Sequence, residues 1–191
     1  MKRVGLTGSI GAGKSVAAAW LRARGVPVHE ADIAVHEIYA RPEVLAWLGE
    51  NFPGALRAGT LSRAHLAEII YTDEKMRKLL EDYIHPLVRA DSADFARRAE
   101  NKSDIIVFDI PLLFETGRDA EMNETWLITA PPDVRRARVL ATREITAEKF
   151  EAINRAQMPD QEKRARADRV IENTGTLDAF YEKLACLIGP K

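Results

Sequence analysis

The sequence predicts an α/β fold with a parallel sheet of five strands between two layers of helices. Two observations predict it. Short β-rich segments recur at residues 3–6, 26–29, 105–109, 126–129 and 169–171, each nearly all apolar in its middle, as in strands buried on both faces. Helix-like stretches separate these segments. Gly25 is placed to end the first helix, and Pro131-Pro132-Asp133 is placed to open another.

Composition limits the environment and partners of the chain. Its 191 residues suit one compact domain, and 28 basic residues against 29 acidic ones leave no basic excess for nucleic acid. No polybasic or amphipathic anchor, signal peptide or membrane-length apolar window is present, so we expect no membrane association. Cys186 is the single cysteine, and its apolar neighbours favour a buried position. We expect a cytoplasmic protein, either a monomer or a weak homo-oligomer.

The first strand leads into a glycine-rich segment that carries the strongest chemical signal. It consists of Gly8, Ser9, Ile10, Gly11, Ala12, Gly13, Lys14 and Ser15, and a helix-like stretch follows at 16–23. Glycines let several amide N–H groups face one point at a helix N-terminus, where phosphates bind. Lys14 can reach the β- and γ-phosphates, and the Ser15 hydroxyl can bind Mg²⁺. The segment predicts a phosphate-binding loop, but it does not separate kinases from GTPases, motor ATPases or regulators.

About 75 residues between the second and third strands exceed what a crossover needs and have helical character. Ser62 and Thr72 are placed to cap two helices, and Pro86 permits a fresh helix start toward Arg98. The sequence therefore predicts an all-helical insertion.

An arginine-rich helical segment, about residues 134–157, follows the fourth strand, with Thr146 as a helix cap. It contains Arg135, Arg136, Arg138, Arg143 and Arg155. Taken one at a time, such residues favour a solvated helix face. Their position after the fourth strand favours a lid that supplies positive charge to a transferring phosphate.

Acidic residues end two of the predicted strands. Glu30 and Asp32 follow the second strand, and their side chains share a face only if the extended conformation continues through both. Asp32 could accept a proton from the acceptor hydroxyl, orient it, or bind Mg²⁺ through water. It could equally cap the helix that follows. Asp109 ends the third strand, where a second acid commonly supports the Mg²⁺ shell.

Histidine provides one further signal. His85 precedes a proline and lies one helical turn before Arg89, so the two could lie together at a helix start. Both residues could instead be structural, with His85 forming a hydrogen bond and Arg89 pairing with an acid. His29, His36, His65 and His85 show no metal-ligand spacing with Cys186, so we expect no structural metal.

Taken together, these segments resemble the dephospho-coenzyme A kinase family over residues 3 to about 175. The resemblance rests on Gly5-Leu6-Thr7-Gly8 and the loop after it, Glu30-Ala31-Asp32, His85-Pro86-Leu87-Val88-Arg89, Pro111-Leu112-Leu113-Phe114-Glu115, Gln157 and residues 167–173. His-Pro-x-x-Arg and Pro-Leu-Leu-Phe-Glu in this order are close to diagnostic. The resemblance implies a P-loop NTPase-type fold and transfer of the γ-phosphoryl group of ATP, with Mg²⁺, to the ribose 3′-hydroxyl of dephospho-coenzyme A.

The resemblance also implies a role for individual regions and residues. A single kinase domain would comprise a core (about 1–40, 104–133 and 161–191), an acceptor-binding insertion (about 41–103) and a lid (about 134–160). Asp32 would be the base near the acceptor hydroxyl, and Arg138 a lid arginine. Acceptor or phosphate binding would involve His85 and Arg89, with Leu113 also at the substrate site. Asn173 would form part of the adenine pocket.

Two positions depart from the family pattern. Glu30 stands where aspartate is usual, which moves its carboxylate about one methylene outward. Thr142 stands where the family often has a second lid arginine, and Arg143 follows it. A one-residue offset turns a side chain by about 100° on a helix, so Arg143 could substitute only if the helix has already ended.

Two other functions fit parts of the pattern. A kinase of the same architecture could act on a nucleoside monophosphate or on shikimate, but it would carry other acceptor motifs. A nucleotide-binding regulator that has lost transfer would be favoured by loss of Lys14, Ser15 or Asp32, and all three are present.

Overall fold

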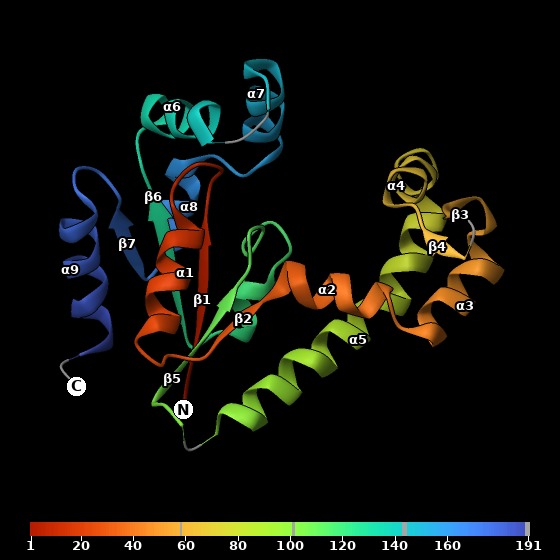
Figure 1. Ribbon diagram of the computed structural model, residues 1–191, viewed down its shortest axis with the longest axis horizontal. Coiled ribbons are helices and arrows are strands. Elements are labelled where there is room, and N and C mark those ends of the chain that lie inside the picture. Colours follow the sequence, from red (N-terminus) through yellow and green to blue (C-terminus); the bar gives the residue numbers. More distant parts are fainter. Residues whose placement is uncertain (58, 101, 143–144, 190–191) are drawn as a thin grey trace. The chain divides into compact units, whose positions relative to one another are not determined.

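The computed structural model describes residues 1–57, 59–100, 102–142 and 145–189 (Figure 1). Its main sheet has five strands in the order β2-β5-β1-β6-β7. These strands are β1 (Lys2–Gly8), β2 (Val28–Glu30), β5 (Ile105–Asp109), β6 (Glu124–Thr129) and β7 (Arg169–Glu172). The β1–β5, β1–β6 and β6–β7 pairs are parallel. All five predicted strands are confirmed, each within two residues of its expected start.

The helices and the short strands complete the element order. The helices are α1 (Lys14–Ala23), α2 (Ala31–Tyr39), α3 (Pro42–Asn51), α4 (Arg63–Thr72), α5 (Glu74–Ala99), α6 (Pro132–Thr142), α7 (Ala147–Ala156), α8 (Asp160–Arg166) and α9 (Leu177–Ile188). Two 3₁₀ turns lie at Pro53–Ala55 and Arg118–Glu121, and two short strands at β3 (Leu56–Arg57) and β4 (Thr60–Leu61). Within the described residues, no helix is long and apolar enough to cross a membrane.

The chain divides into two compact units, which we call unit 1 (residues 1–29 and 99–191) and unit 2 (residues 30–98). The family resemblance places residues 30–40 in the core, but the contacts group α2 with the insertion. The Arg-rich segment containing α6 and α7 belongs to unit 1.

Unit 1 is organised around the main sheet, with one face covered by α1 and α9 (Figure 1). Val4 and Leu6 of β1 point to that face and join a core that includes Leu21 of α1 and Phe180 of α9. Successive side chains of a strand point to opposite faces, so Gly5 lies toward the other face, where Leu113 packs on it. Burial on both faces explains why the middle of β1, residues 4–6, carries no polar side chain.

Cys186 is exposed, contrary to the sequence-based expectation. Phe180 and Leu184 lie four residues apart on the buried face of α9. Cys186 is two residues beyond Leu184 and is therefore rotated by about 200° on the helix, away from that face. An apolar segment at a helix end does not by itself bury every member.

Unit 2 has its own apolar core, built from α2 to α5 and including Ile38, Leu48 and Leu80. Two expectations for this region are wrong in detail. The insertion is not all helical, because β3 and β4 pair as a short antiparallel hairpin. No fresh helix starts at Pro86, because α5 continues through it from Glu74 to Ala99. A proline in a helix interior removes one hydrogen bond and crowds the carbonyl four residues earlier, and the helix accommodates Pro86 at an exposed position.

Candidate active site

The glycine-rich loop connects the carboxyl end of β1 to the first turn of α1. Gly11 and Gly13 have φ angles of 79° and 100°, the left-handed region that glycine adopts without strain. A Cβ on Gly13 would also lie 2.2 Å from Nδ2 of Asn173. The Ala12 amide donates to the Ser9 carbonyl over 3.0 Å, which closes the loop on itself. The chain therefore curls directly into a helix N-terminus, the arrangement that binds phosphate through backbone amides.

Lys14 and Asp109 form an ion pair in unit 1. Lys14 begins α1, and Asp109 ends β5, which lies beside β1 with Asp109 in register with Leu6. The two side chains are 16% and 5% exposed. Ser15, the next residue of α1, is exposed. The structure thus brings the predicted phosphate-binding lysine and one predicted Mg²⁺ ligand together at the carboxyl edge of the sheet, the usual ligand site in such sheets.

Ile10 is held at both of its backbone polar groups by residues far along the chain. Its N–H donates to Oε1 of Gln157 over 3.0 Å, and its carbonyl accepts from Arg135 over 3.2 Å. Arg135 also donates to the Ala130 carbonyl and to Oδ1 of Asn154. Its side chain is buried, so this member of the Arg-rich segment braces the loop and does not lie on a solvated face. Sequence reasoning did not find either contact.

Asn173 and Arg138 form a second brace on the loop. The Asn173 side chain is buried and donates to the Ala12 carbonyl over 2.9 Å, while Arg138 donates to the Asn173 carbonyl over 3.0 Å. Nη1 of Arg138 is also buried, and it has no hydrogen-bond partner among the described residues. These contacts place both residues beside the loop. The predicted roles at adenine and at the transferring phosphate stay predictions.

We expect Gly13→Ala to weaken nucleotide binding and to lower stability. The new Cβ would meet Asn173. The alanine would also have to adopt a left-handed backbone conformation, which costs about 1–2 kcal/mol for a residue with a side chain. Gly175→Ala is the matched control, because Gly175 has φ 96° and, among the described residues other than its chain neighbours, no atom lies within 4 Å of where its Cβ would be. Melting temperature and the Kd for ADP would be measured for both. A similar Kd in the two variants would show that the contact with Asn173 is unimportant.

Glu115, the last residue of Pro-Leu-Leu-Phe-Glu, fixes the segment that carries Gln157. Its Oε1 accepts the Met158 amide over 2.9 Å and lies 2.9 Å from Nζ of Lys163, a residue with no exposed side-chain surface. The Lys163 contact has the distance of an ion pair without the alignment of a hydrogen bond. Burial raises the pKa of Glu115, but the contacts with Lys163 and Met158 lower it by more, so its pKa lies below the ordinary 4.5.

We expect Glu115→Gln to lower the free energy of unfolding by about 3 kcal/mol at pH 7, because it leaves the buried Lys163 charge unpaired. A carboxyl with a lowered folded-state pKa stabilises the fold above its unfolded pKa and loses that contribution as pH falls through the folded value. The difference between wild type and variant should therefore shrink below about pH 4.5. Urea unfolding at several pH values measures it. A constant difference across that range would contradict the assignment, and Lys163→Met added to the variant should restore part of the loss.

The acidic pair after β2 does not have the extended geometry that would align it. β2 ends at Glu30, which is the N-cap of α2, and Asp32 is the second residue of that helix. Asp32 is therefore not a helix cap, and it does not share a strand face with Glu30. Its carboxylate is exposed in the first turn of α2, where the helix dipole favours negative charge. A role for Asp32 at the acceptor hydroxyl stays a prediction.

The other predicted substrate residues have different surroundings. His85 and Arg89 are exposed on α5, four residues apart and so on one side of the helix, but in its interior and not at a start. Leu113 has no exposed surface and packs against Gly5. The structure supports a packing role for the Leu113 side chain, and substrate binding by it stays a prediction.

The last expectation concerns whether Arg143 replaces the second lid arginine, which is absent at Thr142. The Thr142 hydroxyl donates to the Arg138 carbonyl over 2.6 Å at the end of α6. Arg143 lies outside the described residues, so its substitution for the arginine missing at Thr142 stays untested.

Comparison with known proteins identifies the family. The family model for dephospho-CoA kinase matches residues 2–179. A dephospho-CoA kinase from Cereibacter sphaeroides is 47% identical over 187 residues, covering 97% of this chain and 93% of the relative. One from Rhizobium meliloti is 40% identical, covering 97% and 95%.

Solved structures share the fold of this chain. A crystal structure from Thermus thermophilus has a TM-score of 0.89 at 38% identity, covering 97% of this chain and 95% of the other. A dephospho-CoA kinase from Campylobacter jejuni (TM-score 0.71, 24% identity, 97% and 94% coverage) shares the fold. A shikimate kinase from Bacteroides thetaiotaomicron, with a TM-score of 0.51 at 17% identity, is likewise similar in fold. The family model and these relatives, together with the loop and the sheet, show that the chain belongs to the dephospho-CoA kinase family of P-loop kinases.

Proposed function

We propose that this chain transfers the γ-phosphoryl group of ATP to the ribose 3′-hydroxyl of dephospho-coenzyme A, giving coenzyme A and ADP, the final step of coenzyme A synthesis. The observation that carries the donor half is the glycine-rich loop with Lys14 at the start of α1 and Asp109 beside it. Backbone amides and Lys14 hold the β- and γ-phosphates. Phosphoryl transfer depends mainly on such positioning and on charge stabilisation.

Mg²⁺ fits the oxygen ligands at this edge of the sheet. We propose that the Ser15 hydroxyl and the Asp109 carboxylate hold it together with phosphate oxygens and water, which suits the preference of Mg²⁺. No cluster of three or more His, Cys, Asp or Glu side chains in the described part of the chain could hold a metal by itself. The bound ion would neutralise phosphate charge. When ATP and Mg²⁺ bind, Lys14 would exchange its contact with Asp109 for the phosphates.

The remaining roles follow the family resemblance. We propose that Asp32 accepts the proton of the 3′-hydroxyl, that His85 and Arg89 bind the acceptor, and that Arg138 brings charge to the transferring group. Two observations support this role for Arg138: it lies beside the loop, and its buried Nη1 has no hydrogen-bond partner within the described part of the chain. We also propose that the protein acts in the cytoplasm.

A coupled ADP-release assay tests the function, run with dephospho-coenzyme A, adenosine monophosphate and shikimate as acceptors. We expect turnover with dephospho-coenzyme A well above that with the other two, and phosphorus NMR should place the new phosphate on the ribose 3′-oxygen. Faster turnover with either of the others would overturn the acceptor assignment. ADP release without any acceptor would indicate an ATPase.

A further inference from the structure

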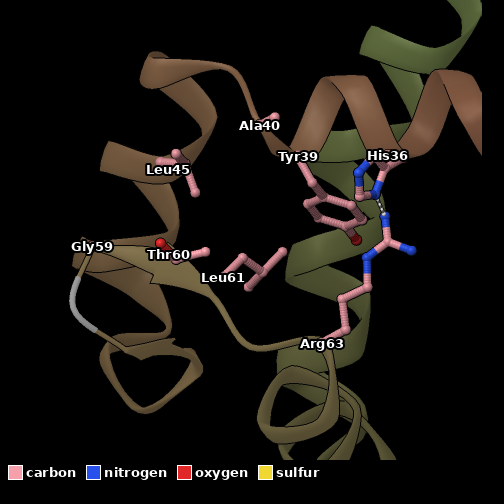
Figure 2. Close-up of a pocket in the computed structure, with 8 residues that line it drawn as sticks. All are labelled: His36, Tyr39, Ala40, Leu45, Gly59, Thr60, Leu61 and Arg63. Carbon is pink, nitrogen blue, oxygen red and sulfur yellow. Dashed lines mark hydrogen bonds between the residues drawn. The ribbon is translucent and has the colours of Figure 1, made fainter.

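Unit 2 contains a cavity of about 240 Å³ at the far end of α2 from Asp32 (Figure 2). The end of α2, the start of α3, the strand β4 and the start of α4 contribute its walls. His36, Tyr39, Thr60 and Arg63 supply polar groups, whereas Leu45 and Leu61 supply an apolar side. Ligand sites commonly measure about 300–1,000 Å³, so this cavity suits one part of a ligand.

The polar side of the cavity is rich in hydrogen-bond donors. Arg63 approaches Nδ1 of His36 at 2.6 Å, and Figure 2 shows the two side chains meeting at the cavity. Because a guanidinium only donates, Nδ1 of His36 must accept, and its proton then lies on Nε2. His36 therefore presents an N–H donor. No acidic side chain among the described residues forms an ion pair with Arg63, which keeps its positive charge uncompensated.

Tyr39 adds a neutral donor on the same side. The guanidinium of Arg63 lies 6.0 Å from the centre of its ring. Burial raises the pKa of the Tyr39 hydroxyl, while the charge of Arg63 acts in the opposite direction, and the net shift is upward. The hydroxyl is thus protonated at neutral pH. One cation and two neutral donors, with no carboxylate among the lining residues, match an anionic ligand.

One face of α2 connects this cavity to the proposed catalytic base. Asp32, His36 and Tyr39 are spaced by four and three residues, so they form one stripe along the helix. At about 1.5 Å of rise a residue, His36 lies about 6 Å and Tyr39 about 10 Å from Asp32 along the axis. Nothing in this relation depends on how the two units are placed, because all three residues belong to unit 2.

We propose that the cavity binds the 5′-diphosphate of the acceptor and the first part of its pantetheine arm. In dephospho-coenzyme A, five covalent bonds separate the 3′-oxygen from the first phosphorus, a reach of about 6 Å at about 1.5 Å a bond. A 3′-hydroxyl at Asp32 therefore puts the diphosphate beside His36 and Arg63. The pantetheine arm then begins against Leu45 and Leu61. This inference rests on the proposed function and on Asp32 facing the 3′-hydroxyl.

Steady-state kinetics of the full-length protein test the inference through Arg63→Met. We expect the KM for dephospho-coenzyme A to rise tenfold or more, about the loss of one charged hydrogen bond, with kcat and the KM for ATP within twofold of wild type. Tyr39→Phe should raise the same KM about threefold, because it removes a neutral hydrogen bond. Arg77→Met is the control, since Arg77 is an exposed arginine of the same unit paired with Glu74 and outside the cavity.

Four results separate failure of the diphosphate site from failure of the proposed function. An unchanged KM for dephospho-coenzyme A in Arg63→Met, or an equal rise in Arg77→Met, would overturn the diphosphate site. A fall in kcat at constant KM would also overturn it, because the cavity is meant to bind and not to react. Absence of turnover by the wild type with dephospho-coenzyme A would instead defeat the proposed function itself. Circular dichroism melting of each variant excludes unfolding, and Arg63→Lys should retain part of the affinity because it keeps the charge but loses the planar fork.

Discussion

Lys14→Ala should lower kcat about a thousandfold while the protein stays folded. Removing one fixed charge aimed at the developing transition state typically costs a factor of about 10² to 10³, and Lys14 also holds the ground-state phosphates in the proposal. The lysine side chain is not part of the apolar core of unit 1. Stopped-flow or coupled-assay turnover and the melting temperature would be measured on the same preparation. Near-normal turnover in the folded variant would contradict the role of Lys14.

The ion pair with Asp109 makes a sharper version of this experiment possible. Lys14→Ala removes that cation from the Asp109 carboxylate, which is 5% exposed, so part of any loss of stability comes from the lost ion pair. Adding Asp109→Asn removes the negative charge and should restore part of the melting temperature. It should not restore turnover, because it removes a proposed Mg²⁺ ligand as well. Recovery of turnover in the double variant would show that Lys14 acts mainly by neutralising Asp109.

The sheet could be predicted because its signals are local. Each strand of the main sheet is a short apolar segment between turn or helix signals, and tertiary contacts did not change its type. The comparisons confirm the predicted family and fold class. The β3–β4 hairpin was missed because its strands are two residues long and its connection lacks the asparagine or aspartate that usually precedes the turn glycine. That hairpin supplies Thr60 and Leu61 to the cavity, so missing the hairpin also concealed the cavity.

The glycine-rich loop could be predicted for the same reason, since its eight residues are contiguous. The contacts that brace it could not. Asp109 lies 95 residues from Lys14, Gln157 lies 147 from Ile10, and Asn173 lies 161 from Ala12. No spacing rule links residues so far apart, because their contact depends on which strands are neighbours. The order of strands, with β5 and β6 on either side of β1, brings these segments to the loop.

The start of α2 shows how a boundary of one residue changes the interpretation of a site. The sequence left Asp32 either as an acid on an extended segment or as a helix cap, and the structure has neither. With α2 beginning at Ala31, Asp32 occupies the first turn of the helix. The same boundary aligns Asp32 with His36 and Tyr39, a relation that an extended segment would not have produced. In our proposal, Asp32 on the helix can therefore contact the 3′-hydroxyl of the same acceptor molecule whose diphosphate lies in the cavity.

Asp32→Asn should reduce kcat by a factor of about 10² to 10⁴, the usual contribution of a general base, and leave the KM for ATP nearly unchanged. Asparagine keeps the size of the side chain and loses only the proton-accepting charge. Loss of an acid from a helix first turn costs about 0.5 kcal/mol, too little to unfold the protein. Glu37→Gln is the matched control, since Glu37 is an exposed acid on the same helix five residues further on and so on another side.

The dependence of turnover on Mg²⁺ concentration separates a base from a metal ligand. If Asp32 acts on the acceptor hydroxyl, the variant should need the same Mg²⁺ concentration for half-maximal rate and should be slow at every concentration. If Asp32 binds Mg²⁺ through water, the rate of the variant should approach that of wild type as Mg²⁺ is raised. Because only a deprotonated carboxylate accepts the proton, the wild-type rate should also fall in acid, and Asp32→Asn should lose this acid limb whereas Glu37→Gln retains it. An acid limb that survives in Asp32→Asn would assign the proton transfer to another group, and Asp32 would then position the hydroxyl without accepting its proton.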